Sequence, residues 1–287
     1  MLTKEEFQNL LAHGPLILDG ATGSNLQKAG MPKGCCTEEW ILMHPEALVK
    51  LQRAYAEAGS HIIYAPTFQA QPLALEAVGM AAHTEKINEA LVALSRSAAP
   101  GCLIAGDLTT MAASCESWDP DNFDLMVAAY RRQIRGLIDG GADLLIGETL
   151  LYPQEAEAIR EAAQAENAGA VLFSFTMQPD GTLFSGQDAA SVLRELEAMG
   201  AAAVGFNCVA ASEDTPFLVS KLRRKVKGPL ICKPNAGLPA TAPDGSECYS
   251  MTPEEFGAIQ ARCREFGAAL LGGCCGTTPE HIAALKF

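Results

Sequence analysis

Short apolar runs alternate with longer amphipathic segments along the whole chain. Eight of these runs have the length of a strand, and most are rich in Ile, Leu, Val or Phe, which is typical of parallel strands buried on both faces. The predicted strands are Leu16–Gly20, His61–Thr67, Cys102–Leu108, Leu144–Leu150, Val171–Met177, Ala203–Val209, Leu230–Ala236 and Ala269–Gly276.

The segments between these runs have the apolar spacing of helices. In Ala47–Ala58, apolar side chains recur three and four residues apart at Leu48, Leu51 and Tyr55, which places them on one helix face. The same spacing predicts helices at Phe123–Ile138, Ala190–Met199, Thr215–Val226 and Pro253–Phe266.

A strand followed by a helix, repeated eight times, predicts an α/β fold of the (β/α)8 TIM-barrel type. No break in composition divides the chain, so we expect a single domain over residues 1–287, with its core at about 14–286. The segment Leu2–Leu11 predicts a short helix that covers the barrel floor. An open doubly wound sheet is the alternative, but Gly20-Ala-Thr-Gly23 after the first strand lacks the dinucleotide-binding pattern.

Charge and hydropathy narrow the possible partners. The chain has 34 acidic and 21 basic residues, a formal net charge of −13, which disfavours nucleic acids and anionic membranes as partners. No apolar run approaches the ~18 residues of a membrane span. The acidic N-terminal segment differs from a signal peptide, so we expect a cytoplasmic protein with its ten cysteines reduced.

Three cysteines lie where barrel enzymes carry their chemistry, at the carboxyl ends of strands. Cys208 ends the sixth predicted strand, and Cys274 and Cys275 end the eighth between glycines. Three thiolates can hold Zn²⁺ with one coordination position left open, as catalytic sites do. We therefore predict a zinc site of Cys208, Cys274 and Cys275; the alternative is that they are ordinary small core residues.

A zinc centre with three thiolates is anionic and therefore polarises water poorly. It still binds an incoming thiol, which loses its proton on coordination. The chemistry that fits is activation of a substrate thiol for attack on an electrophilic carbon, that is, alkyl transfer to sulfur.

Five sequence motifs resemble those of the homocysteine S-methyltransferase family. They are Asp19-Gly-Ala-Thr-Gly23, Glu148-Thr149, Gly205-Phe-Asn-Cys208, Pro234-Asn-Ala-Gly-Leu-Pro239 and Gly272-Gly-Cys-Cys-Gly-Thr-Thr-Pro279. The layout is most similar to the homocysteine-binding domain of cobalamin-dependent methionine synthase, from about Leu16 to Leu285. The resemblance implies a barrel that holds zinc with three cysteines and methylates homocysteine to methionine.

The resemblance and the chemistry of homocysteine together suggest substrate contacts. Glu148, with Asp19 beside it, suits the ammonium group, and backbone N–H groups of the Gly20–Ser24 turn suit the carboxylate. Asn235 either borders the open zinc position or only ties down its loop. The predicted substrate-binding residues are Asp19, Gly20, Ala21, Gly23, Ser24, Glu148, Thr149 and Asn235. The alternatives are a plain strand-to-helix turn and a solvated loop carboxylate.

The methyl donor is the open question. Segments such as Ala65-Pro-Thr-Phe-Gln69 and Glu148-Thr-Leu150 depart from the family pattern where the donor would lie. We expect methylcobalamin carried by a separate corrinoid protein that docks at the barrel mouth, which makes this chain a module of a split methionine synthase. A self-sufficient enzyme would instead use S-methylmethionine or S-adenosylmethionine. From other classes, we weigh a non-catalytic zinc or redox barrel and a Schiff-base aldolase acting through Lys233.

Two further features have no assigned role. Four loop cysteines, Cys35, Cys36, Cys115 and Cys248, are either ordinary thiols or alternative metal ligands or a redox pair. The basic run Lys221–Lys227 is either a solvated helix end or a docking surface for an acidic partner.

Overall fold

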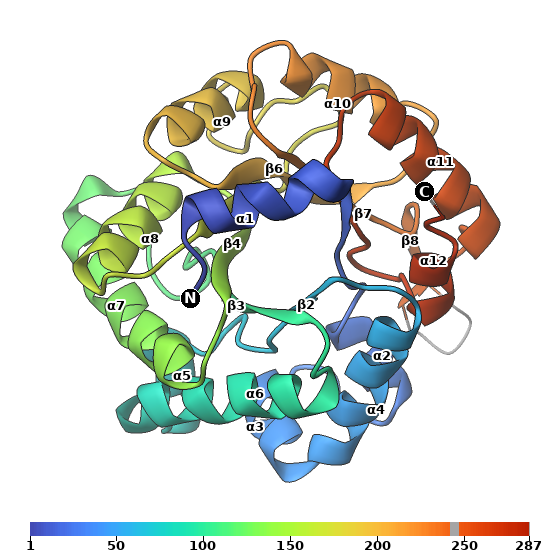
Figure 1. Ribbon diagram of the computed structural model, residues 1–287. Coiled ribbons are helices and arrows are strands. Elements are labelled where there is room, and N and C mark those ends of the chain that lie inside the picture. The colour runs from blue at the N-terminus through green and yellow to red at the C-terminus, as the bar shows by residue number, and fades with distance from the viewer. Residues whose placement is uncertain (242–246, 287) are drawn as a thin grey trace.

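Eight parallel strands form a ring around the centre of the molecule (Figure 1) in the computed structural model, which describes residues 1–241 and 247–286. The strands of the ring are β1 (Leu16–Ile17), β2 (Ile62–Tyr64), β3 (Leu103–Thr109), β4 (Leu144–Leu150), β5 (Val171–Phe175), β6 (Ala203–Ala210), β7 (Leu230–Asn235) and β10 (Leu270–Leu271). They pair in the order β1-β10-β7-β6-β5-β4-β3-β2.

The ring closes between its first and second strands. Leu18 forms a parallel bridge with Ile62, and the backbone N–H of His61 donates to the carbonyl of Ile17 at 2.7 Å. Closure confirms the predicted TIM barrel and excludes the open doubly wound sheet. All eight predicted strands are present.

The first and last strands of the ring are shorter than predicted. Regular pairing stops after Ile17 and Leu271. Beyond these residues the two segments approach so closely that only glycine fits at position 272. The backbone N–H of Gly273 there donates to the carbonyl of Asp19 at 3.0 Å. The residues that continue each apolar run therefore lie at the mouth of the barrel and take no part in regular strand pairing.

Helices surround the ring (Figure 1), and they include every helix predicted from apolar spacing. Those of the outer layer are α4 (Pro45–Glu57), α6 (Thr84–Ala98), α7 (Phe123–Asp139), α8 (Pro153–Ala165), α9 (Ala189–Ala198), α10 (Thr215–Arg223), α11 (Pro253–Glu265) and α12 (Pro279–Ala283). Shorter helices in the loops are α2 (Gly23–Lys28), α3 (Thr37–Met43) and α5 (Pro72–Leu75), with 3-10 turns at Leu11–His13, Glu76–Val78, Ala81–His83 and Pro120–Asn122.

Two elements after β7 were not predicted. The strands β8 (Pro239–Thr241) and β9 (Glu247–Tyr249) pair antiparallel outside the ring. They are too short and polar to give the apolar run used to find the barrel strands. A side chain from this hairpin, Tyr249, reaches the turn at Gly276.

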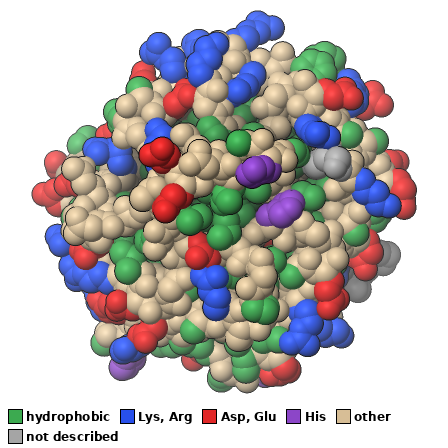
Figure 2. Space-filling model, viewed as in Figure 1, with side chains coloured by type: hydrophobic (Ala, Val, Ile, Leu, Met, Phe, Trp, Pro, Cys, Tyr) green, Lys and Arg blue, Asp and Glu red, His purple; other side chains and the backbone are tan. Residues whose placement is uncertain are grey.

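The helix α1 (Lys4–Leu10) lies across one end of the ring (Figure 1), which confirms the predicted floor helix. Its Phe7 is fully buried in a cluster with Leu18, Ile62 and Leu270 from the strands. Figure 2 shows this face of the molecule, with apolar and histidine side chains near its centre and charges of both signs around it. The floor is therefore closed by apolar packing.

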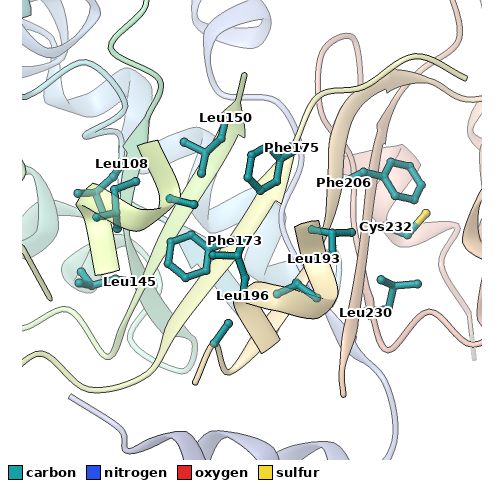
Figure 3. Close-up of a cluster of buried hydrophobic side chains, with 14 of the residues drawn as sticks. Leu108, Leu145, Leu150, Phe173, Phe175, Leu193, Leu196, Phe206, Leu230 and Cys232 are labelled. Carbon is teal, nitrogen blue, oxygen red and sulfur yellow. The ribbon is translucent and has the colours of Figure 1, made fainter. Parts of the chain in front are cut away.

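Alternate strand residues fill two layers. On β5, Phe173 and Phe175 point outward and pack with Leu193 and Leu196 of α9 (Figure 3), while Leu172 belongs to the cluster above the floor. Inward positions nearer the carboxyl ends of the strands are polar. The barrel interior is thus apolar at the floor and charged at the mouth, where enzymes of this architecture place their sites. No helix in the described part of the chain is long and apolar enough to cross a membrane.

Candidate metal centre and substrate pocket

Three sulfur atoms converge at the mouth of the barrel. The Sγ atoms of Cys208, Cys274 and Cys275 all lie within 4.8 Å of one another, and those of Cys208 and Cys275 are 4.0 Å apart. Thiolates bound at ~2.3 Å to a tetrahedral zinc ion lie about 3.8 Å from each other. The cluster therefore matches the predicted three-cysteine zinc site in both composition and spacing.

The backbone is strained where two strands deliver their side chains to this site. Cys208 and Thr149 have φ angles of 56° and 55°, in the left-handed region that non-glycine residues rarely adopt. The register shifts at the same points, between Gly147 and Leu150 on β4 and between Asn207 and Ala210 on β6. Such bulges redirect side chains beside active sites.

The other two cysteines are fixed by hydrogen bonds to β7. The N–H of Cys274 donates to the carbonyl of Pro234 at 2.8 Å, and the N–H of Cys275 donates to Oδ1 of Asn235 at 3.0 Å. Asn235 is not among the residues lining the cavity. The hydrogen bond from the N–H of Cys275 ties Asn235 to the loop that carries this cysteine, which is the contact expected for one of its two predicted roles. The next residue, Gly276, has a φ of 80° and lies against the Tyr249 ring.

The three thiols hold their protons in the absence of a cation. The pKa of Cys208 and that of Cys275 are raised to about 12. The largest cause is hydrogen bonding among the sulfurs, and burial adds to it. Three buried thiolates are stable together only beside a compensating positive charge. A divalent cation would supply that charge and displace the protons.

A cavity of about 270 Å³ opens beside the sulfurs. Its lining residues come from most strands of the ring: Asp19, Gly20, Ala21, Thr22, Gly23, Ser24, Thr37, Glu38, Tyr64, Ala65, Pro66, Phe68, Gln69, Asp107, Glu148, Thr149, Cys208, Lys233, Cys274 and Cys275. Apart from Asn235, every residue predicted for the site lines this one cavity.

Carboxylates face the sulfurs across the cavity. Asp19 follows β1, Asp107 lies on β3 and Glu148 lies on β4, and each is almost completely buried. Burial raises the pKa of Asp19 to about 7, although Lys233 and the N–H of Tyr64, which donates to Asp19 Oδ2 at 2.8 Å, oppose the shift. Burial, with the charge of Glu148, raises the pKa of Asp107 well above its usual value.

Lys233 lies between two of these carboxylates. Its Nζ is 3.7 Å from Asp19 Oδ1 and 3.7 Å from Glu148 Oε2, and it lies 4.7 Å from the centre of the Tyr64 ring. Burial lowers the pKa of Lys233, but the charges of Glu148 and Asp19 outweigh burial and raise it well above its usual value. The side chain is thus an ammonium ion, whereas a Schiff-base lysine must reach its neutral form.

Asn207 joins the carboxylates to the sulfurs. Its Oδ1 accepts from the N–H of Thr149 at 2.8 Å and from the hydroxyl of Ser174 at 2.9 Å. Its Nδ2 donates to Oγ1 of Thr149 at 2.6 Å and points to Glu148 Oε2 at 3.5 Å and Cys274 Sγ at 3.8 Å. One buried amide therefore orients both halves of the site.

The turn after β1 forms another wall of the cavity. Gly20 is required because a Cβ there would lie 2.6 Å from the hydroxyl oxygen of Tyr55. The N–H of Ala21 donates to Oγ1 of Thr277 at 3.1 Å, so this amide of the predicted anion-binding turn is engaged within the protein. Gly23 and Ser24 begin α2 and line the cavity.

The remaining thiols lie apart from this cluster. Within residues 1–241 and 247–286, Cys35, Cys36, Cys115 and Cys248 belong to no group with metal-ligand spacing. The basic run makes intramolecular contacts: Lys225 pairs with Asp188 at 2.8 Å.

From the sequence, Asp107 had no assigned role, and Lys233 was considered only as a Schiff-base lysine. Both lie at the carboxyl ends of ring strands and point inward, so the rule that identified Glu148 applies equally to them. Their neighbours explain the omission: Lys233 stands within a mostly apolar run, and its two partners are distant in sequence.

Barrel strands that end in three convergent sulfurs and several carboxylates define the class, an α/β-barrel enzyme with a cysteine cluster that has the spacing of a metal site. The family follows from comparison: residues 16–287 match the model for homocysteine S-methyltransferase. The chain belongs to this family of methyltransferases.

Similar proteins include both long and short chains. The methionine synthases of Mycobacterium leprae and Mycobacterium tuberculosis are 28% and 27% identical over 95% and 96% of this chain, which spans 24% of each. The chain thus spans about a quarter of the length of these relatives.

Solved structures agree with the fold. The metallated form of the homocysteine methyltransferase MmuM from Escherichia coli superposes with a TM-score of 0.83 at 28% identity, over 98% of both chains. The oxidised form of the same enzyme superposes with a TM-score of 0.80 at 28% identity, over 95% of both chains. A carboxyl transferase domain of Rhizobium etli pyruvate carboxylase superposes with a TM-score of 0.57 at 15% identity, over 95% of this chain and 43% of that one. This similarity shows the fold alone.

Proposed function

We propose that this protein transfers a methyl group to the thiol of homocysteine and so produces methionine. The observation that carries the proposal is the convergence of Cys208, Cys274 and Cys275 on a cavity whose other wall bears Asp19 and Glu148. A molecule with a thiol at one end and an ammonium at the other matches both walls. Membership of the family supports homocysteine as that molecule.

The three cysteines would hold Zn²⁺, which supplies a Lewis-acid centre that takes up a thiol and lowers its pKa. The residues of the chain position the substrate around it. Asp19 and Glu148 accept hydrogen bonds from the ammonium group, and the turn from Gly20 to Ser24 faces the carboxylate. The thiol proton leaves to solvent, the sulfur forms a bond to the methyl carbon, and the bond from that carbon to the donor breaks.

For the donor, we propose methylcobalamin on a separate corrinoid protein, so that the chain acts as one module of a split methionine synthase. Two observations support this. The chain is 28% identical to a methionine synthase over 95% of its own length. The loops after β3, β5 and β7 expose Trp118, Phe184 and Leu238, which are 47%, 54% and 75% accessible, around the same mouth.

A self-sufficient enzyme that uses S-methylmethionine or S-adenosylmethionine is the second candidate. The match to MmuM over 98% of both chains favours it. Purified protein should be assayed with homocysteine and each free donor in turn. Turnover with a sulfonium donor alone would refute the split-module proposal, whereas turnover only with a methylated corrinoid protein would support it.

X-ray absorption at the zinc edge tests the chemistry apart from the donor. Addition of homocysteine to zinc-loaded protein should raise the number of sulfur ligands from three to four. A spectrum that does not change would instead support a non-catalytic zinc or redox barrel.

A further inference from the structure

Lys233 occupies an unusual position for a side chain that binds neither metal nor substrate in the proposed function. It is 3% accessible, and among the described residues that line the cavity it is the only cation. The acidic residues in the same lining are Asp19, Glu38, Asp107 and Glu148. A buried positive charge placed among four acids has a specific electrostatic consequence.

The two contacts of Lys233 are ion pairs and not short hydrogen bonds. Both separations are 3.7 Å, beyond the usual N–H···O distance. Asp19 Oδ1 is buried and has no hydrogen-bond donor within the described part of the chain. Lys233 therefore stabilises the negative charge of Asp19 and Glu148 while leaving an oxygen available for a second donor.

The charge count shows why a second donor fits. Burial raises the pKa of Asp107 well above its usual value and also raises the pKa of Glu38, which favours the neutral form of both groups. The carboxylates of Asp19 and Glu148 then face one resident ammonium group, that of Lys233, at 3.7 Å each. One further monocation makes this part of the cavity neutral, which is the favoured condition for buried charges.

We propose that Lys233 is a positioning residue that holds the carboxylates of Asp19 and Glu148 on either side of its ammonium group, and so sets the preference for a thiol that carries an ammonium group. Without Lys233, the two neighbouring carboxylates would repel each other in a buried site, and one of them would take up a proton. The protonated carboxyl would no longer attract the ammonium group. The inference rests on the proposed function because it assigns the ammonium end of the substrate to these carboxylates.

The test compares two thiols that differ only at the ammonium position. Homocysteine and 4-mercaptobutanoate have the same carbon chain, thiol and carboxylate, but the second lacks the amine. Calorimetric titrations of zinc-loaded protein should show that Lys233→Met weakens the binding of homocysteine by about 10- to 100-fold. The affinity for 4-mercaptobutanoate should remain unchanged. Zinc content is measured in parallel and should remain the same.

A double-mutant cycle separates this role from a purely structural one. If Lys233 acts by keeping Asp19 ionised, Lys233→Met combined with Asp19→Asn should bind homocysteine no more weakly than Asp19→Asn alone. The loss in Lys233→Met should also shrink at higher pH, where Asp19 ionises again. Lys233→Gln, which keeps a hydrogen-bond donor without the charge, replaces Lys233→Met if that variant does not fold.

Each outcome gives a decision. Equal weakening of both thiols would overturn the inference, because Lys233 would then act on the sulfur cluster. Tighter binding of homocysteine to Lys233→Met would also overturn it, because Lys233 would then compete with the ammonium group. If neither thiol changes the zinc-edge spectrum of the wild-type protein, the proposed function itself fails.

Discussion

At the scale of single residues, the site depends on side chains whose ionisation differs from that in water. The sulfurs of Cys208 and Cys275 hold their protons without a cation, and Asp19 titrates near neutrality. Both effects follow from burial beside neighbours of like kind. Burial and the neighbouring groups therefore set the charges with which the site meets its ligands.

Replacement of any one of the three clustered cysteines by alanine should abolish zinc binding and activity while the barrel remains folded. The ring closes without the cysteine side chains, so the far-UV circular dichroism of Cys208→Ala, Cys274→Ala and Cys275→Ala should match that of the wild type. Zinc is measured by atomic absorption. Cys36→Ala is the control, and loss of zinc in that variant would show that the ligand set is different.

The binding preference for homocysteine should depend on pH through Asp19. Its pKa of about 7 is raised from 3.8, so the carboxylate that attracts an ammonium group is lost as pH falls below 7. The affinity for homocysteine relative to 4-mercaptobutanoate should be roughly tenfold higher at pH 8 than at pH 6. Both molecules release a thiol proton on binding, so the pH dependence of that step cancels in the ratio of their affinities.

Asp19→Asn supplies the control for this titration. The ratio of the two affinities should be low and independent of pH in that variant. A wild-type ratio that also stays constant from pH 6 to pH 8 would contradict the assignment of Asp19 to the ammonium group.

At the scale of elements, the strands could be predicted, whereas the backbone conformation at their carboxyl ends could not. Leu144–Leu150 is both the predicted and the observed strand, because its apolar run is buried on both faces. At Cys208 and Thr149 the backbone adopts positive φ, which tertiary contacts impose and no local pattern signals. The three cysteines were found because all of them lie at strand ends. The position of Lys233 between Asp19 and Glu148 depends on three strands far apart in sequence.

Gly276 should be essential to the turn that carries two of the ligands. A Cβ there would lie 2.2 Å from the Tyr249 ring, in addition to the cost of roughly 1–2 kcal/mol for positive φ. Gly276→Ala should therefore lower both the melting temperature and the zinc content. Gly141→Ala is a matched control because Gly141 has a φ of 84° with nothing within 4 Å of its Cβ position. Equal effects of the two substitutions on zinc content would refute this role of the turn.

At the scale of the whole molecule, the barrel separates its two ends. Phe7 and its neighbours pack the floor, and the charged groups, sulfurs and cavity lie at the mouth. Exposed apolar side chains occur on three loops of the mouth. This polarity of the fold was predictable from the order of strands and helices, whereas the exposed patch depends on loop conformations that carry no periodic pattern.

Substitution of the exposed mouth residues should weaken transfer from a corrinoid protein without affecting the substrate thiol. Trp118→Ala combined with Phe184→Ala should reduce kcat/KM for the methylated corrinoid protein by about tenfold or more, and leave calorimetric binding of homocysteine unchanged. Met199→Ala, at the opposite end of the barrel, is the control, since Met199 is 49% accessible there. Undiminished transfer in the double variant would argue against docking at this surface.

The sealed floor beneath α1 has a kinetic consequence. If the donor is a corrinoid protein that docks over the mouth, the acceptor must bind before the donor arrives, and the thioether product cannot leave until the spent donor dissociates. Turnover should therefore follow a compulsory sequence, with excess donor trapping product inside.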